Sequence, residues 1–281
     1  GRRVGSATPE VSSAPDPESI LQIALTAVTT AMVGGTLAQA LAASDDAMEL
    51  IERRPGLLTT TPVSLMPVGL RSTVLAFSGR LDEAEELSSR GLEAARLAGQ
   101  VEIEGFANGW RALALLSRGH SQEALRHARR ALEIAEKLDS PFSRAIARMS
   151  CAMVGSFLAL WPETERWGQE GVTIIREHHV AMMFEPFLLT FWAEALAARG
   201  ESERAQELIA EAIAKVQSFG MGVVEVRAHL GQARILLWTS ALPHAGEIEA
   251  AVRTAEHLAH EIGLAGWLPW VYEERAALAL T

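Results

Sequence analysis

The chain contains a short sequence element that recurs about every 40 residues. A glycine followed five positions later by an alanine occurs at Gly35, Gly79, Gly119 and Gly200, in steps of 44, 40 and 81. The last step is about twice the period, and the divergent segment LALWPETERWGQEGVTII lies in the interval. Another divergent copy, LLWTSALPHAGEIEAAVRTAEHLA, lies near residue 240. Six copies of one short unit predict a stacked array in which each unit contacts its neighbours.

Each unit is predicted to form a pair of helices. An apolar segment leads into the glycine, which favours the left-handed conformation that ends a helix. Small residues then follow at offsets of four and three, as in Ala124, Ala128 and Ala131, and such offsets define one helix face. Charged residues occupy the opposite face. The small residues allow close approach of the paired helix, so the pattern predicts an all-α chain.

Small residues at the eighth, twentieth and twenty-seventh positions of a helical hairpin are typical of the tetratricopeptide repeat, which these units resemble. The matching residues are Ala112, Ala124 and Ala131 in one unit and Ala193, Ala205 and Ala212 in another. The period exceeds the 34 residues usual for that repeat, and the usual closing proline is missing. The longer variant is similar to the helical sensor region of the maltose-regulon activator and large LuxR-type regulators. It also resembles the C-terminal repeats of bacterial regulators and cyclases with a STAND-type ATPase.

The resemblance spans residues 16–281 and implies a right-handed superhelix of about six and a half hairpins with a concave inner face. The units are predicted at 17–56, 60–99, 101–139, 141–180, 182–220 and 222–263, with one further helix at 267–281. Residues 1–15 are rich in Ser, Pro and Gly and predict a flexible linker.

The composition limits the partners that we expect. A net charge of −10 argues against direct nucleic-acid binding and against docking on anionic membranes. The apolar runs at 20–33 and 149–161 are shorter than the roughly 20 residues that a membrane span needs. Cys151 is the single cysteine, so no internal disulfide can form, and an apolar surrounding sequence predicts that it is buried. We therefore expect a cytoplasmic protein.

Sequence signatures of catalysis are missing. The chain has no phosphate-binding Gly-x-x-x-x-Gly-Lys loop and no Gly-x-Ser-x-Gly elbow. His257 and His260 lie three residues apart on one predicted helix, but a zinc site needs three or four converging ligands and no strong third ligand is evident. We expect a protein that is not an enzyme and that carries no metal or other cofactor.

In the resembling repeats the first helix of each hairpin lines the concave face, and this implies a set of groove residues here. The positions are apolar in the middle of the chain and combine Trp, Arg and Glu toward its end, which suits a flat or apolar ligand with a few polar groups. The candidate ligand-binding residues are Phe106, Met149, Met153, Phe157, Phe187, Glu194, Arg227, Arg234, Trp238, Trp267 and Trp270.

Packing offers an alternative explanation of the same residues. Aromatic and Met side chains at helical spacing commonly fill the contacts between helices. Arg227 and Arg234 lie seven residues apart on one helix face, where a solvated surface or salt bridges with Glu225 and Glu247 would account for them.

Two functions remain open from the sequence. The first is a sensor or scaffold module of a larger bacterial signalling or transcription regulator, which binds a small effector or a partner segment and passes the signal to other domains of its parent protein. The second is a protein–protein adaptor that binds a peptide or mediates self-association as a homo-oligomer. A closed pocket near Trp238 would favour an effector, and an open channel would favour a peptide.

Overall fold

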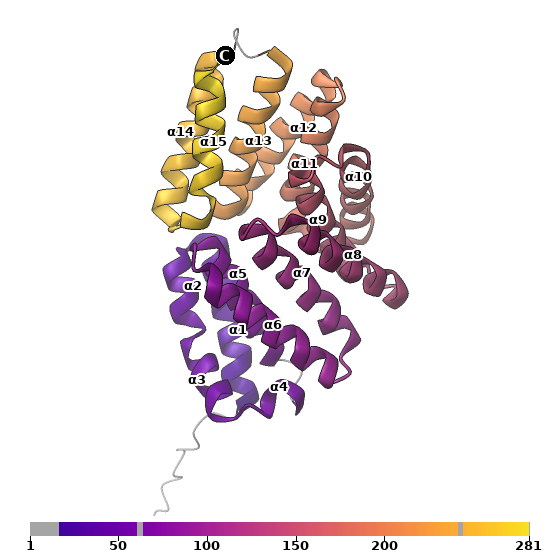
Figure 1. The fold of residues 1–281 in the computed structure, drawn as a ribbon, viewed down its shortest axis with the longest axis vertical. Coiled ribbons are helices and arrows are strands. Elements are labelled where there is room, and N and C mark those ends of the chain that lie inside the picture. The colour runs from indigo at the N-terminus through magenta and orange to yellow at the C-terminus, as the bar shows by residue number, and fades with distance from the viewer. Residues whose placement is uncertain (1–16, 61–63, 241–243, 281) are drawn as a thin grey trace, which may run out of the picture.

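The computed structural model describes residues 17–60, 64–240 and 244–280. The predicted linker, residues 1–15, lies outside this part of the chain. The described residues form α-helices, short 3-10 turns and connecting loops, with no strand among them. The predicted all-α superhelix is confirmed, and Figure 1 shows successive helices stacking along a curved path.

The helical elements follow one another along the chain with short connections. They are α1 (Pro17–Gly34), α2 (Leu37–Ala43), α3 (Asp45–Arg53), α4 (Leu57–Thr60), α5 (Leu65–Phe77), α6 (Leu81–Leu97), α7 (Val101–Ser117), α8 (Ser121–Leu138), α9 (Pro141–Phe157), α10 (Trp161–His178), η2 (Met182–Phe184), α11 (Glu185–Ala198), α12 (Ser202–Phe219), α13 (Gly222–Ser240), α14 (Ala245–Ile262), η3 (Ala265–Trp267) and α15 (Leu268–Ala279). Consecutive pairs from α5–α6 to α13–α14 form hairpins. None of the described helices combines the length and apolar character that a membrane-spanning segment needs.

Three of the four predicted turn glycines adopt the left-handed conformation, whereas Gly35, between α1 and α2, does not. Gly79, Gly119 and Gly200 have φ values of 78°, 82° and 86°, each directly after the first helix of a hairpin. In the divergent fourth unit the same place is taken by Ala159, which has a φ of 55°. The turn geometry therefore persists where its glycine is missing, at the cost of a side chain held in the left-handed region.

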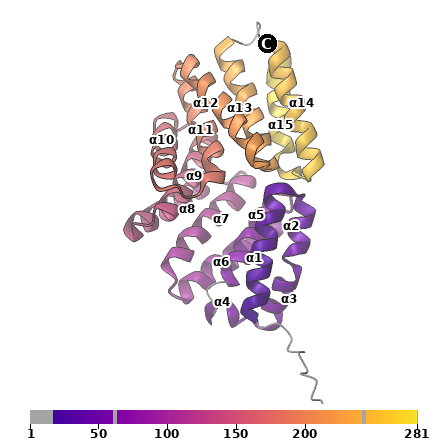
Figure 2. The same cartoon turned by 180° about the vertical axis from the view of Figure 1, so that it is seen from behind.

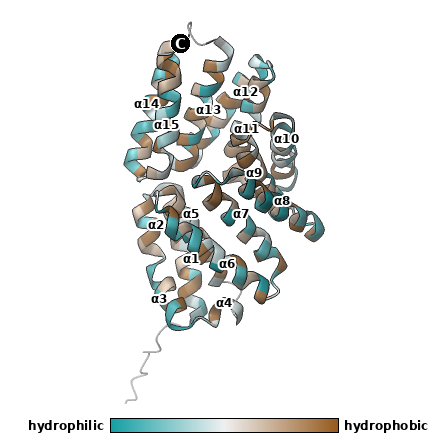
Figure 3. Cartoon of the chain, in the orientation of Figure 1, coloured by the Kyte–Doolittle hydropathy of each residue, from teal (hydrophilic) through white to brown (hydrophobic). Residues whose placement is uncertain are grey.

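Small residues sit where second helices pack closely against neighbouring helices, within a hairpin or in the next one. Ala124 and Ala128 are fully buried on α8. On α10, a Cβ added to Gly168 would lie 2.7 Å from Cβ of Trp192 on α11, closer than real side chains permit. The opposite face of each second helix is polar. In Figure 3, α8 is largely hydrophilic along its exposed side.

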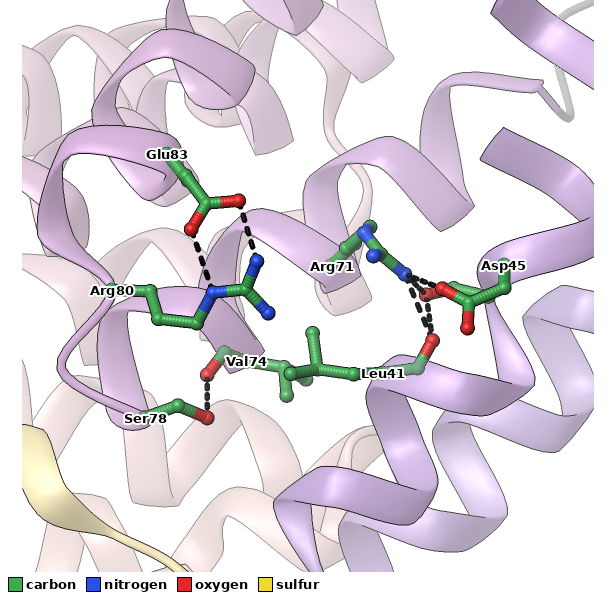
Figure 4. A network of polar contacts seen from close by, with 8 residues as sticks. Leu41, Asp45, Arg71, Val74, Ser78, Arg80 and Glu83 are labelled. Carbon is green, nitrogen blue, oxygen red and sulfur yellow. Dashed lines mark hydrogen bonds and ion pairs between the residues drawn. The ribbon is translucent and has the colours of Figure 1, made fainter. Parts of the chain in front are cut away.

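The first unit departs from the regular hairpin, because its second half consists of two short helices. The break falls at Ser44, between α2 and α3. There Nη1 of Arg71, on α5, donates hydrogen bonds to the carbonyl of Leu41 and to Asp45 Oδ1, both at 2.8 Å (Figure 4). A guanidinium from the next unit thus satisfies a carbonyl at the end of α2, and the chain restarts with acidic residues at the beginning of α3.

The two halves of the superhelix meet. Figures 1 and 2 show the lower ends of α14 and α15 beside the upper ends of α2 and α5. At this junction a Cβ added to Gly266 in η3 would lie 2.3 Å from the carbonyl oxygen of Ala76 in α5. Backbone therefore packs directly on backbone, and η3 and α15 reach across the array to its second unit.

Candidate binding surface on the concave side

A network of buried charges joins the first helices of successive hairpins. Glu194 on α11 is fully buried and accepts hydrogen bonds from Arg227 Nη2 at 2.6 Å to each of its carboxylate oxygens. Ser156 Oγ on α9 donates a further hydrogen bond of 2.6 Å to Glu194 Oε2. Arg234 lies on the same face of α13, seven residues beyond Arg227, and its Nη1 is 3.6 Å from Glu194 Oε1.

The network continues to α15 through Glu274. Nε of Arg234 donates to Oε1 of Glu274 over 2.6 Å, and both side chains are largely buried. Two guanidiniums and two carboxylates thus lie together with no net charge, which is how a protein interior tolerates ions. We call the set of Ser156, Glu194, Arg227, Arg234 and Glu274 the charge network.

The two carboxylates of the charge network differ in their electrostatic environment. Burial alone would raise the pKa of Glu194, but the Arg227 and Arg234 guanidiniums and the hydrogen bonds from Arg227 and Ser156 hold it below its usual value. Burial raises the pKa of Glu274, and Arg234 offsets this only in part. The charged form of Glu194 is therefore well stabilised, whereas the charged form of Glu274 is stabilised less.

Aromatic side chains from distant helices meet around η3 and α15. Trp267 is 2% exposed and meets Phe77 of α5 edge-to-face, with ring centroids 5.2 Å apart. Its ring also lies 6.5 Å from that of Phe187 on α11 and 5.3 Å from that of Trp270. Trp270 in turn lies 4.5 Å from Phe157 of α9. We call these five residues the aromatic cluster.

The structure brings most of the sequence-predicted site residues together. Phe157, Phe187, Trp267 and Trp270 belong to the aromatic cluster, and Glu194, Arg227 and Arg234 to the charge network. The arginines pair with Glu194 and Glu274, and not with Glu225 or Glu247 as the packing alternative supposed. These groups connect neighbouring helices of the array, and Glu194, Arg227 and Trp267 are buried between them.

Three predicted residues lie apart from this group. Met149 and Met153 are partly buried and pack on the hydrophobic core. Phe106 lies beside Trp110 and Phe142, with ring centroids 6.4 and 5.9 Å apart, and borders a cavity of about 10 Å³. That space holds about one water molecule, so it is too small for an organic ligand.

Trp238 forms the exposed edge of the inner surface. Its side chain is 44% exposed and meets Trp161 edge-to-face, with centroids 5.4 Å apart. The Arg234 guanidinium carbon lies 5.9 Å from the centre of the Trp238 ring, within range of a cation–π contact. An exposed indole beside a guanidinium can stack on a flat ligand and contact an anionic group.

Sequence reasoning did not single out Ser156 or Trp161. Ser156 belongs to the last turn of α9, and its only sequence signal is a polar side chain in the apolar run MSCAMVGSFLAL. Trp161 is the first residue of α10, just beyond the turn, and groove positions counted only within first helices miss it. Its unusual position, a Trp directly before Pro162, was a signal that could have found it.

The described residues contain no group of three or more His, Cys, Asp or Glu side chains arranged to hold a metal ion. Cys151 is fully buried, as predicted, and burial raises the pKa of its thiol to about 12. A thiol that stays protonated at neutral pH is a poor nucleophile.

No protein-family model and no curated protein matches the sequence. Solved structures do match. A Rap protein complexed with Competence and Sporulation Factor aligns with a TM-score of 0.60 and 14% identity, over 86% of this chain and 71% of that one. A STAND protein with a tetratricopeptide repeat sensor, from Pyrococcus horikoshii, aligns with a TM-score of 0.53 and 15% identity, over 94% of this chain and 38% of that one.

The TPR-like repeats of a Podosopora anserina putative kinesin light chain align with a TM-score of 0.51 and 18% identity, over 73% of this chain and 98% of that one. At such identities the similarity concerns the fold. Together with the hairpins, turns and small-residue faces described above, it establishes the fold class: the chain is a tetratricopeptide-like helical repeat domain.

Proposed function

We propose that this chain is a non-catalytic regulatory module that recognises a protein segment on its concave side. It would act as the sensor or scaffold part of a larger cytoplasmic bacterial signalling or transcription regulator. One observation carries the proposal. One helix of the chain, α15, contacts the first helices of two hairpins through the Trp270 ring on Phe157 of α9 and the Glu274 carboxylate on Arg234 of α13. The same chemistry suits a helix from another protein.

The structural neighbours agree with this direction. The Rap protein was solved complexed with Competence and Sporulation Factor, and the STAND protein carries its repeats as a sensor. The STAND protein is a signal transduction ATPase, although a fold alone does not define a ligand.

Selection of helical peptides from a random library against the full chain tests the proposal. We expect selected peptides to bind with a dissociation constant in the micromolar range or below, and Phe157→Ala to weaken them at least tenfold. Arg126→Ala is the matched control, because Arg126 is exposed on the outer face of α8. Circular dichroism checks that both variants are folded. Peptides that bind equally well to the Phe157→Ala variant, or that are lost with Arg126→Ala, would contradict a concave site.

A small effector is the second candidate, and the exposed Trp238 beside Arg234 and Trp161 favours it. A thermal-shift screen with sugars, nucleotides and aromatic acids tests this candidate. A ligand at 100 times its dissociation constant adds about 2.7 kcal/mol of stability. We expect Trp238→Ala to abolish such a shift while the melting temperature without ligand stays unchanged. A shift that survives this substitution rules out the Trp238 site.

A further inference from the structure

Residues 265–279, which form η3 and α15, pack on α13 and α14 and reach α5. We call them the closing segment. From the closing segment, Trp267 and Trp270 enter the aromatic cluster, and Glu274 enters the charge network. It packs most extensively on α14 and α13, and individual side-chain contacts reach α5, α9 and α11. A segment placed in this way fills the surface that a partner helix would need.

The spacing of its contact residues resembles that of a helical ligand. Trp267, Trp270 and Glu274 are separated by three and four residues, so they lie on one side of the helix. The opposite side carries Tyr272, which is 46% exposed. The two Trp rings contact Phe77, Phe157 and Phe187 on the helices that hold the segment. The Glu274 carboxylate pairs with the Arg234 guanidinium.

Two features leave polar groups of the closing segment poorly satisfied. Within the part of the chain that the structure describes, Nε1 of Trp267 is buried without a hydrogen-bond partner, and a buried donor left unpaired opposes the closed arrangement. Burial also disfavours the charged form of Glu274. At its start, the segment is joined to α14 by Gly263, which is in the left-handed conformation with a φ of 79°, and Leu264. A partner helix that satisfied these groups better would displace it.

We propose that the closing segment is a displaceable internal ligand that blocks the concave surface until a partner helix of the same chemistry replaces it. This partner carries two aromatic side chains three residues apart and a carboxylate four residues further along. The inference rests on the proposed concave site. It adds the side-chain pattern that the site recognises and the displacement that regulates its access.

A disulfide can hold the segment closed. A Cβ added to Gly79 would lie 3.7 Å from Cβ of Ala265, which matches the separation of about 3.8 Å typical of disulfides. We call the double variant Gly79→Cys and Ala265→Cys of the full chain, joined by this disulfide, the lock. Cys151 does not interfere, because it is buried and its pKa is raised to about 12. The reduced form of the same protein is the control for the strain of a side chain at residue 79.

The probe is a fluorescent synthetic peptide with the sequence of residues 264–280, LAGWLPWVYEERAALAL. Trp270→Ala in the full chain weakens the closing segment, and Tyr272→Ala is the matched control, because it removes an aromatic ring from the exposed side of the same helix. By fluorescence anisotropy we expect the Trp270→Ala protein to bind the peptide at least tenfold more tightly than the wild type. Tyr272→Ala should behave as the wild type.

Oxidation of the lock in the Trp270→Ala protein should abolish peptide binding, and reduction should restore it. A peptide carrying Glu274→Gln and Trp270→Ala should not bind. Equal affinity of the oxidised and reduced proteins, or no binding to the Trp270→Ala protein, would overturn the proposal.

The library-selected peptides separate the two proposals. If they bind the concave face equally well in the oxidised and reduced lock, the concave site stands and displacement is wrong. If neither form binds them at a Phe157-dependent site, the proposed function fails as well. Hydrogen exchange gives an independent readout: we expect α15 amides to exchange at least tenfold faster than those of α11. Equal protection of the two helices would make the closing segment a fixed cap.

Discussion

The charge network shows how single side chains connect neighbouring repeats. Arg227 is 33 residues beyond Glu194, and Glu274 is 40 residues beyond Arg234, so each pair links a helix to its equivalent in the next unit. Buried ions of this kind contribute little net stability as a group, but removal of one partner leaves an uncompensated charge. The network therefore constrains how successive hairpins are placed.

Replacement of Glu194 by alanine should destabilise the protein strongly. Arg227 would lose its carboxylate partner inside the molecule, and breaking a buried pair costs about 3–5 kcal/mol. Urea denaturation followed by circular dichroism measures this loss. Glu203→Ala, on the exposed side of α12, should change the free energy of unfolding by less than about 0.5 kcal/mol. A loss below about 1 kcal/mol for Glu194→Ala would mean that water reaches the pair.

His127 should make stability fall as the pH decreases from 7. Its Nδ1 lies 2.9 Å from Oδ1 of Asn108, and its pKa is lowered from 6.5, first by burial and then by the Arg111 charge. The unfolded chain therefore takes up a proton before the folded one does. The associated stability is complete above about pH 6.5 and is lost as the pH falls toward the folded pKa.

Urea denaturation of the wild type and of His127→Gln at pH 7.5 and 5.5 checks this expectation. The variant lacks the titrating group, so the difference in unfolding free energy between the two proteins should shift in favour of the variant at the lower pH. An imidazole that titrates at or above 6.5 in an NMR experiment would contradict the buried, neutral state.

At the level of the helices, the sequence predicts the regular hairpins well and the irregular ones poorly. Gly79, Gly119 and Gly200 were predicted to be in the left-handed conformation because only the local chain determines that turn. Ala159 adopts it without glycine, since packing of α9 on α10 fixes the turn. The break at Ser44 depends on Arg71 from the following unit, and no local pattern contains that contact.

Replacement of Ala159 by glycine should stabilise the protein. Glycine adopts a φ of 55° without the steric cost of a Cβ, so we expect a gain of about 1 kcal/mol. The control is Ala250→Gly on the exposed side of α14, where loss of helix propensity should cost about 1 kcal/mol. Thermal and urea denaturation of both variants measure the effects. Opposite signs are expected, and destabilisation by both would contradict the assigned turn.

At the level of the molecule, the period predicted a stacked helical array, but not the contact between α5 and η3. A repeat pattern reports on neighbours, whereas Phe77 and Trp267 are 190 residues apart. Their contact depends on the accumulated curvature of all intervening units, which small differences in helix length and crossing angle determine. The candidate residues were therefore predicted as one group, but the contacts of Trp267 with Phe77 and of Trp270 with Phe157 were not.

Gly266→Ala should disrupt this contact. The added Cβ would lie 2.3 Å from the carbonyl oxygen of Ala76, and backbone cannot move aside as a flexible side chain can, so we expect a loss of about 1–3 kcal/mol. Gly246→Ala is the matched control, because nothing lies within 4 Å of its added Cβ on α14. That variant should be neutral or stabilised when its thermal denaturation is compared with that of the wild type. Equal behaviour of both variants would contradict the direct backbone contact.

The contact between α5 and η3 also changes how such an array should unfold. In an open solenoid each hairpin interacts only with its neighbours, so the outermost units fray first and the transition spreads inward. Here Trp267 and Phe77 link distant units, and opening either one removes support from the other. While the closing segment is in place, the array therefore forms a ring of coupled units, in which cooperativity extends beyond adjacent hairpins.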